Sequence, residues 1–106
     1  MSTWKVEFIP EAHEDLIALD NTQRIQVIKA IKKVSANPLP ANEGGLGKPL
    51  GSHSGNNLTG YLKIKLLKLG LRVIYRIAHE GNVMKIIVVS VRDDETVYKM
   101  AKERTT

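Results

Sequence analysis

The sequence predicts an α+β domain in which a pair of helices packs on one side of a largely antiparallel four-stranded sheet. Residues 61–77 alternate apolar and polar side chains on both sides of Gly70, which is typical of a β-hairpin. Residues 10–34 contain two successive helical stripes, and residues 83–91 form an apolar, β-branched run that suits a central strand. The expected order is β-α-α-β-β-β-α, in a single domain spanning residues 1–106.

Length and composition describe one ordinary globular domain. A chain of 106 residues can bury one modest core, and 42% hydrophobic with 25% charged residues excludes a disordered chain. There are no cysteines, so neither a disulfide nor a thiolate metal site is expected, which fits a reducing compartment. No run resembles a signal peptide or a membrane span. We therefore expect a cytoplasmic protein with no membrane partner.

The positive charge is concentrated in the middle of the chain. The net charge is +5, a balance that favours nucleic acid, an acidic protein or an anionic membrane surface as partner. No acidic residue lies between Glu43 and Glu80. The basic residues of that interval are Lys48, Lys63, Lys65, Lys68, Arg72 and Arg76.

The N-terminal third predicts one strand and two helices. Trp4–Ile9 alternates as a strand, and Pro10 fits the first position of a helix. The first helix has the apolar stripe Ala12, Leu16 and Leu19. A second helix is expected from about Thr22, with Arg24 on its solvent side; its stripe is Ile25, Ile28, Ile31 and Val34, widened by Val27. The short connection between them predicts an antiparallel pair.

Pro38–Gly60 is rich in glycine and predicts a long surface loop with a turn around residues 46–50. A loop of this length in a compact domain is usually functional or mobile.

The hairpin that follows has one apolar and one basic face. Its apolar face combines Leu62, Ile64 and Leu66 with Leu71, Val73, Tyr75 and Ile77. Lys63, Lys65, Arg72 and Arg76 share the opposite, open face with Ile74. Neighbouring strands lie about 4.8 Å apart, so these cations crowd, and an anion is expected to offset the repulsion. The alternative is a solvated face of a small basic protein.

The C-terminal third predicts a turn, a strand and a helix. Gly81-Asn82 predicts a turn, and Val83–Val91 a strand covered on both faces. Asp93 and Asp94 can cap a last helix over Glu95–Arg104. The apolar stripe of that helix is Val97, Met100, Ala101 and Arg104.

These segments together suggest a family. Residues 63–66 read Lys-Ile-Lys-Leu, residues 70–75 read Gly-Leu-Arg-Val-Ile-Tyr, and a β-branched run ends at Arg92, six residues before Tyr98. The pattern resembles the RelE/ParE toxin superfamily, and most closely the RelE-type mRNA interferase toxins. The first half agrees in its order of strand, acidic helix, basic helix and Asn-Pro, so the resemblance covers nearly the whole chain.

The resemblance implies a function. The expected protein is the toxin of a type II toxin–antitoxin system, a ribosome-dependent endoribonuclease that needs no metal or other cofactor. Its partners would be a cognate antitoxin, mRNA in the ribosomal A site, and ribosomal RNA. The implied catalytic residues are Lys63, Lys65, Arg72, Arg92 and Tyr98. Many ParE-like relatives lack this full set, so the match favours the nuclease branch.

Two features depart from RelE. Asp93 and Asp94 stand where RelE has a second basic residue, which lowers the local positive charge. The Pro38–Gly60 loop is longer than expected. From their charge, Lys48, Lys68 and Arg76 are expected to bind RNA.

The chemistry follows from the residue types. RNA is cut when its 2′-hydroxyl attacks the adjacent phosphorus and expels the 5′-oxygen. No histidine pair stands out as acid and base, and His13, His53 and His79 show no metal-ligand spacing. Tyr98 is the candidate base, because nearby cations would lower its pKa from about 10, although a lysine could serve instead. Arg72 suits transition-state charge and Arg92 the leaving side.

Three alternatives stay open. Tyr98 could simply cover the core as a helix-flank tyrosine. The chain could be a ParE-like toxin that inhibits a protein target such as gyrase without nuclease activity. It could also be a basic nucleic-acid-binding module without catalysis, which predicts salt-sensitive binding and no growth arrest.

Overall fold

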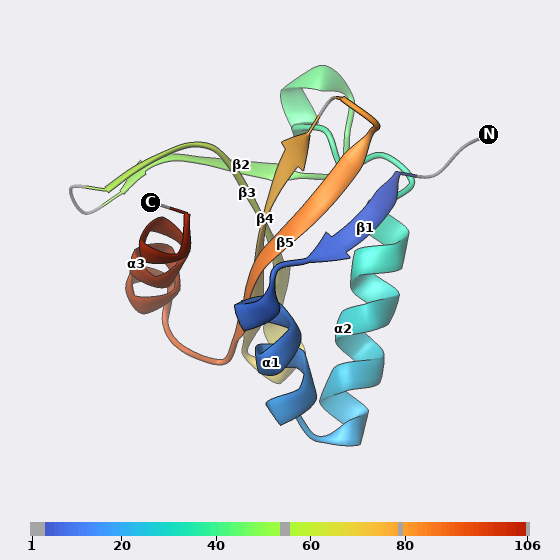
Figure 1. Cartoon of the computed structure of the whole chain (residues 1–106), viewed down its shortest axis with the longest axis vertical. Helices are drawn as coiled ribbons and strands as arrows, with labels where there is room; N and C mark the ends of the chain where they lie inside the picture. Colours follow the sequence, from blue (N-terminus) through green and yellow to red (C-terminus); the bar gives the residue numbers. More distant parts are fainter. Residues whose placement is uncertain (1–3, 54–55, 79, 106) are drawn as a thin grey trace.

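A five-stranded mixed sheet separates two helices from a third in the computed structural model, which describes residues 4–53, 56–78 and 80–105 (Figure 1). The strand order is β1-β5-β4-β3-β2, and only the pair of β1 and β5 is parallel among the described strands. The elements are β1 (Lys5–Phe8), α1 (Pro10–Ala18), α2 (Asn21–Val34), β2 (Lys48–His53), β3 (Asn56–Leu66), β4 (Leu71–Ala78), β5 (Val83–Ser90) and α3 (Asp94–Arg104), with the short 3₁₀ turns η1 (Ala41–Glu43) and η2 (Leu67–Leu69). The predicted α+β class and the order of its expected elements are confirmed.

The fifth strand corrects the expectation of a loop over Pro38–Gly60. β2 and the first residues of β3 pair within this segment. β2 contains Pro49 and Gly51, and its register shifts between them. Proline and glycine are tolerated in an edge strand with a bulge, but in a sequence they indicate a turn.

The central hairpin has the predicted register. Leu62 pairs with Tyr75, and Lys65 pairs with Arg72, so the apolar and basic faces separate as expected. The connection is the 3₁₀ turn η2, which ends at Gly70 with a φ of 65°. A left-handed backbone of this kind favours glycine.

One core lies between the sheet and α1 with α2, which run in roughly opposite directions (Figure 1). Its buried members are Ala12, Leu16, Val27, Ile31, Val34, Leu62, Leu71, Val73, Tyr75, Met84, Ile86 and Val89. The predicted stripe of the second helix is partly wrong, because Ile25 and Ile28 are 44% and 46% exposed. Val27, Ile31 and Val34, spaced one turn apart, point inward instead.

The turn between α1 and α2 is closed by side chains. Asp20 and Gln23 form a capping box at the start of α2. Arg24, expected on the solvent side, instead donates to the carbonyls of Leu16, Ile17 and Leu19 at the end of α1. Arg24 thus supplies donors to carbonyls at the end of α1, of which that of Leu16 also accepts from the Leu19 N–H.

Where β1 ends, two charged side chains take its place as hydrogen-bond partners of the β5 backbone. β5 bulges at Ile87, because Ile74 pairs with Val88 while Tyr75 pairs with Ile86. Beyond the bulge, Arg104 donates to the Ile87 carbonyl at 2.9 Å and Asp15 accepts from the Val89 N–H at 3.1 Å. Arg104 and Asp15 also form an ion pair at 2.7 Å, so they join α3, β5 and α1.

Candidate active site

Helix α3 lies along the basic face of β3, on the opposite side of the sheet from α1 and α2 (Figure 1). Three alternate residues of β3 contact α3 or its C-cap: Lys63 contacts Tyr98 and Lys65 contacts Asp94 in the helix, and Tyr61 contacts the C-cap Thr105. The basic face is therefore largely covered, not open as predicted. The buried residues of this second core are Leu50, Leu58, Tyr61, Ile74, Ile87, Val88, Val97, Tyr98 and Ala101.

One link between strand and helix at the site is the pair of Lys63 and Tyr98. Lys63 Nζ donates to the Tyr98 hydroxyl at 2.9 Å and lies 5.6 Å from the ring centroid. Tyr98 is only 5% exposed, because its ring packs in the second core. The ammonium supplies positive charge and a donor at the phenol oxygen, which is the arrangement that a tyrosine base requires.

Beside this pair, Lys65 of β3 and Arg72 of β4 both contact the carboxylate of Asp94 on α3. Arg72 Nε donates to Oδ1 of Asp94, and Lys65 Nζ lies 3.4 Å from Oδ2. A second guanidinium nitrogen of Arg72 donates to the carbonyl of Arg92 at 2.8 Å, which fixes the plane of the guanidinium. The anion that the crowded cations were expected to need is thus supplied by the protein itself.

Charge and hydrogen bonding keep Asp94 ionised. Partial burial favours the protonated acid, but the hydrogen bonds and charges of Arg72 and Lys65 outweigh it and lower the pKa of Asp94 below its ordinary 3.8. The neighbouring Asp93 caps α3 by accepting from the Thr96 N–H at 2.8 Å, and that bond lowers the pKa of Asp93.

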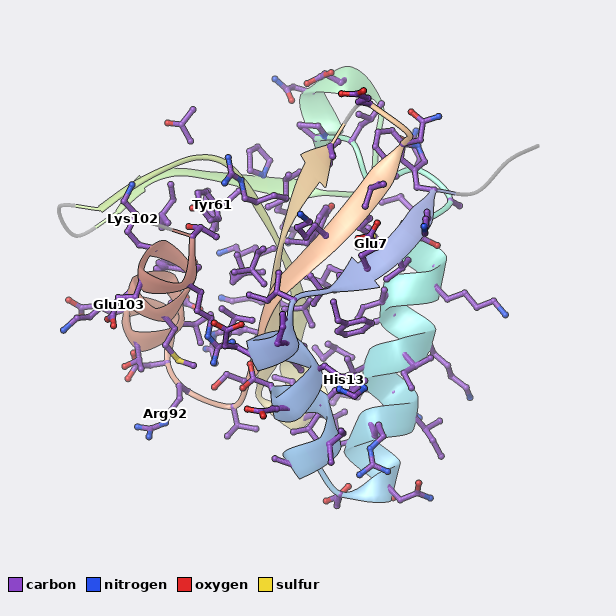
Figure 2. The ribbon with its side chains drawn as sticks, in the orientation of Figure 1. Glu7, His13, Tyr61, Arg92, Lys102 and Glu103 are labelled. Carbon is purple, nitrogen blue, oxygen red and sulfur yellow. The ribbon has the colours of Figure 1, made fainter. Side chains whose placement is uncertain are left out.

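Arg92 does not join the other four predicted catalytic residues. It follows the end of β5 in the bend before α3, and Figure 2 shows its exposed side chain pointing away from the sheet. Its contact with Arg72 is through its backbone carbonyl, which accepts from the Arg72 guanidinium. The basic face was predicted from the alternation of side chains along strands, and that alternation does not determine where a residue outside a strand points.

The three predicted RNA-binding residues do not gather in one place. Lys48 of β2 pairs with Lys63, so its exposed side chain lies on the same face. Arg76 stacks on the Tyr61 ring, 4.8 Å from its centroid. It is four residues from Arg72, or about 13 Å along β4.

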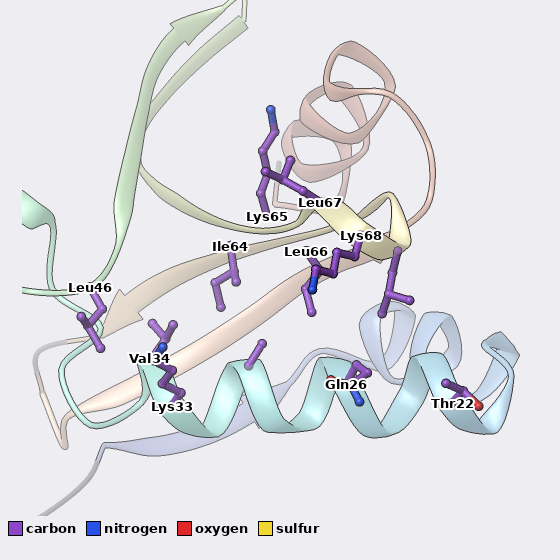
Figure 3. A pocket seen from close by; sticks show the side chains of 12 residues that line it. Thr22, Gln26, Lys33, Val34, Leu46, Ile64, Lys65, Leu66, Leu67 and Lys68 are labelled. Atoms are coloured by element: carbon purple, nitrogen blue, oxygen red, sulfur yellow. The ribbon is translucent and has the colours of Figure 1, made fainter.

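Lys68 lies in η2 and lines a groove of about 680 Å³ between α2 and β3 (Figure 3). Lys65 borders this groove, but its side chain extends from it toward α3 (Figure 3). The groove and the cationic site are therefore on opposite faces of β3. The groove is mainly apolar, and its lining residues are Thr22, Gln26, Ala30, Lys33, Val34, Leu46, Ile64, Lys65, Leu66, Leu67, Lys68 and Leu69.

No family model matches this sequence. A curated Escherichia coli protein, described as a RelE-like toxin, is 27% identical over 101 residues, which cover 95% of this chain and 96% of that protein. The toxin–antitoxin complex RelBE2 of Mycobacterium tuberculosis contains a chain 27% identical to this one, with a TM-score of 0.68 over 89% of this chain and 97% of that one. In sequence and in fold, the chain is similar to RelE toxins. A mutant of E. coli toxin RelE in the free state shares the fold, with a TM-score of 0.74, 24% identity and coverage of 99% and 100%.

Asp94 is the residue of the candidate site whose role the sequence did not indicate. It was expected to cap α3, but only Asp93 does so. The signal was its departure from RelE, because an acidic residue in a basic site requires a cation nearby.

Among the described residues, no cluster of three or more histidine, aspartate or glutamate side chains is placed to hold a metal ion. No helix in the described ranges has the length and apolar character needed to span a bilayer.

Proposed function

We propose that this chain is the toxin of a type II toxin–antitoxin system and that it cleaves mRNA in the ribosomal A site. The observation that supports cleavage most directly is the cluster on one face of β3 and β4, where Lys63 contacts Tyr98 beside Lys65 and Arg72. The relatives support the toxin role, since structures of similar chains include RelBE toxin–antitoxin complexes from M. tuberculosis and E. coli.

The proposed step moves two protons and exchanges one phosphorus–oxygen bond for another. Tyr98, assisted by Lys63, takes the proton of the 2′-hydroxyl, and the 2′-oxygen attacks the phosphorus. Arg72 and Lys65 neutralise the charge that develops on the phosphorane. The bond from phosphorus to the 5′-oxygen breaks, the 5′-oxygen accepts a proton from solvent water, and a 2′,3′-cyclic phosphate remains. Arg92, exposed at the edge of the site, is proposed to contact the leaving side once RNA is bound.

The same function requires partners. We propose that an acidic, amphipathic antitoxin segment covers the half-exposed apolar side chains of α1 and α2, which include Ile17, Ile25 and Ile28. Lys29, Lys32 and Lys33 on α2 add the positive charge that such a segment, or ribosomal RNA, would meet. A ribosomal substrate implies that the protein acts in the cytoplasm.

Expression of the wild type and of Arg72→Ala, followed by mapping of mRNA ends, tests the cleavage. Wild type should arrest growth and create new 5′ ends within coding regions, whereas Arg72→Ala should do neither. Lys85→Ala removes an exposed cation of β5 that pairs with Arg76, away from the catalytic cluster, and is the control for loss of positive charge on the same face. Growth arrest with no new mRNA ends would contradict the nuclease and leave a toxin of another kind.

Burial of Tyr98 and neutralisation of two cations by Asp94 favour one alternative, a ParE-like toxin that inhibits a protein target such as gyrase. Under that reading, Arg72→Ala and Tyr98→Phe would leave toxicity unchanged, and mRNA would stay intact in arrested cells.

A further inference from the structure

We propose that the Asp94 carboxylate occupies the binding position of an RNA phosphate between Lys65 and Arg72, so that RNA must displace it to reach the site. The inference rests on the proposed function for its substrate class, RNA. It makes Asp94 a built-in competitor that keeps the free protein from holding phosphate groups non-specifically.

The geometry of the contact is that of a bound oxyanion. Each oxygen of the Asp94 carboxylate meets a different cation, Oδ1 the Arg72 guanidinium and Oδ2 the Lys65 ammonium. These cations come from paired positions on adjacent strands, and their side chains are mostly buried. Two non-bridging oxygens of a phosphate diester present the same pair of acceptors. While Asp94 is in place, a phosphate would face a carboxylate at the position where it needs donors.

The structure also makes Asp94 free to leave. Asp94 is the first residue of α3, its side chain is 37% exposed, and the helix is capped by Asp93. Rotation of Asp94 into solvent therefore removes no cap. Arg72 keeps its bond to the Arg92 carbonyl, so the guanidinium stays in place for an incoming phosphate. The exchange replaces one anion by another on preorganised cations.

The test compares Asp94→Asn with Glu95→Gln. Both changes remove one negative charge from the first turn of α3, but Glu95 is exposed and no contact to Lys65 or Arg72 involves it among the described residues. The probes are inorganic phosphate and a short single-stranded RNA with 2′-O-methyl riboses, which 2′-hydroxyl attack cannot cut. Affinity is measured by titration at low ionic strength, where charge effects are least screened.

Asp94→Asn is expected to bind both probes about five- to tenfold more tightly than wild type, and Glu95→Gln to stay within about twofold. In a Lys65→Gln background the gain in affinity from Asp94→Asn should shrink, because one of the two cations that bind the phosphate is gone. Unchanged or weaker binding by Asp94→Asn would overturn the proposal and make Asp94 a residue that positions the cations.

Two measurements keep this inference separate from the nuclease. If Asp94→Asn lowers stability, Asp94→Ser is titrated as well, and tighter binding by neither folded variant overturns the proposal. If the protein cuts no mRNA but Asp94→Asn gains phosphate affinity, the proposed function fails and this inference stands. If the protein cuts mRNA and Asp94→Asn gains no phosphate affinity, the proposed function stands and this inference fails.

Discussion

Lys63 of β3 donates a hydrogen bond to the hydroxyl of Tyr98 on α3, at 2.9 Å, beneath a helix that covers the basic face of the sheet. This contact couples the candidate base to its cation and also anchors the helix. Its chemical and structural parts can be separated by substitutions that keep the ring.

Tyr98→Phe should abolish cleavage while the fold survives. The ring still fills the second core, and loss of one hydrogen bond costs about 1 kcal/mol. Removal of a general base lowers the rate by about 10²- to 10⁴-fold. Single-turnover cleavage of ribosome-bound mRNA measures the rate, and urea unfolding measures the stability.

Tyr61→Phe is the matched control, because Tyr61 lies on the same face and bonds Thr105 instead of a lysine. It should lose similar stability and keep its cleavage rate. Equal losses of rate in both variants would mean that Tyr98 acts only through packing.

Acid should remove the stabilisation that Asp94 gives to the fold. Its pKa is lowered in the folded protein, so its contribution is present above the ordinary value of 3.8 and is lost as pH falls through the folded value. The difference in unfolding free energy between wild type and Asp94→Asn should therefore shrink on acidification below 3.8.

Urea unfolding of both proteins between neutral and acid pH, with Glu95→Gln beside them, measures this difference. The pKa of Asp93 is lowered chiefly by its hydrogen bond from the Thr96 backbone, which neither substitution removes, so its contribution should cancel in the comparison. A difference that grows on acidification would show that the sign is wrong.

The ion pair of Asp15 and Arg104 should stabilise the whole domain. Each side chain is mostly buried and also bonds the backbone of β5. Arg104→Ala leaves Asp15 and the Ile87 carbonyl without that donor, so we expect a loss of about 2–3 kcal/mol in urea unfolding. Lys99→Ala, which removes an exposed cation of the same helix, should change the free energy of unfolding by less than about 0.5 kcal/mol. Similar values for the two variants would contradict the proposed role of the pair.

Gly47→Ala should destabilise the loop that precedes β2. An added Cβ would collide with the Tyr75 hydroxyl and would lie 2.5 Å from Leu62 and 2.9 Å from the Pro38 carbonyl. Overpacking of this kind costs about 1–3 kcal/mol. The Tyr75 hydroxyl donates to that same carbonyl, so Gly47→Ala should cost less in a Tyr75→Phe background. Strictly additive costs in urea unfolding would argue against the collision.

Short-range patterns predicted most of the fold. Alternation around Gly70 gave the register of β3 with β4, because a one-residue slip would turn the lysines into the core. β2 was not predicted, because Pro49 and Gly51 indicate a turn unless a neighbouring strand pairs with them.

The site was less predictable, because long-range packing decides it. Lys63, Lys65 and Arg72 share a face by alternation alone, but only the docking of α3 brings Tyr98 and Asp94 onto them. Arg92 was assigned by resemblance, and its exposed position in the bend before α3 could not be read from any periodicity.

Cleavage of mRNA by the purified protein on translating ribosomes, with primer extension to find the cut ends, tests most directly whether the clustered side chains form a nuclease. Wild type and Lys85→Ala should cut within codons at similar rates, and Arg72→Ala should be slower by at least about a hundredfold. Intact mRNA with wild type, under conditions in which an active RelE toxin cuts, would contradict the assignment.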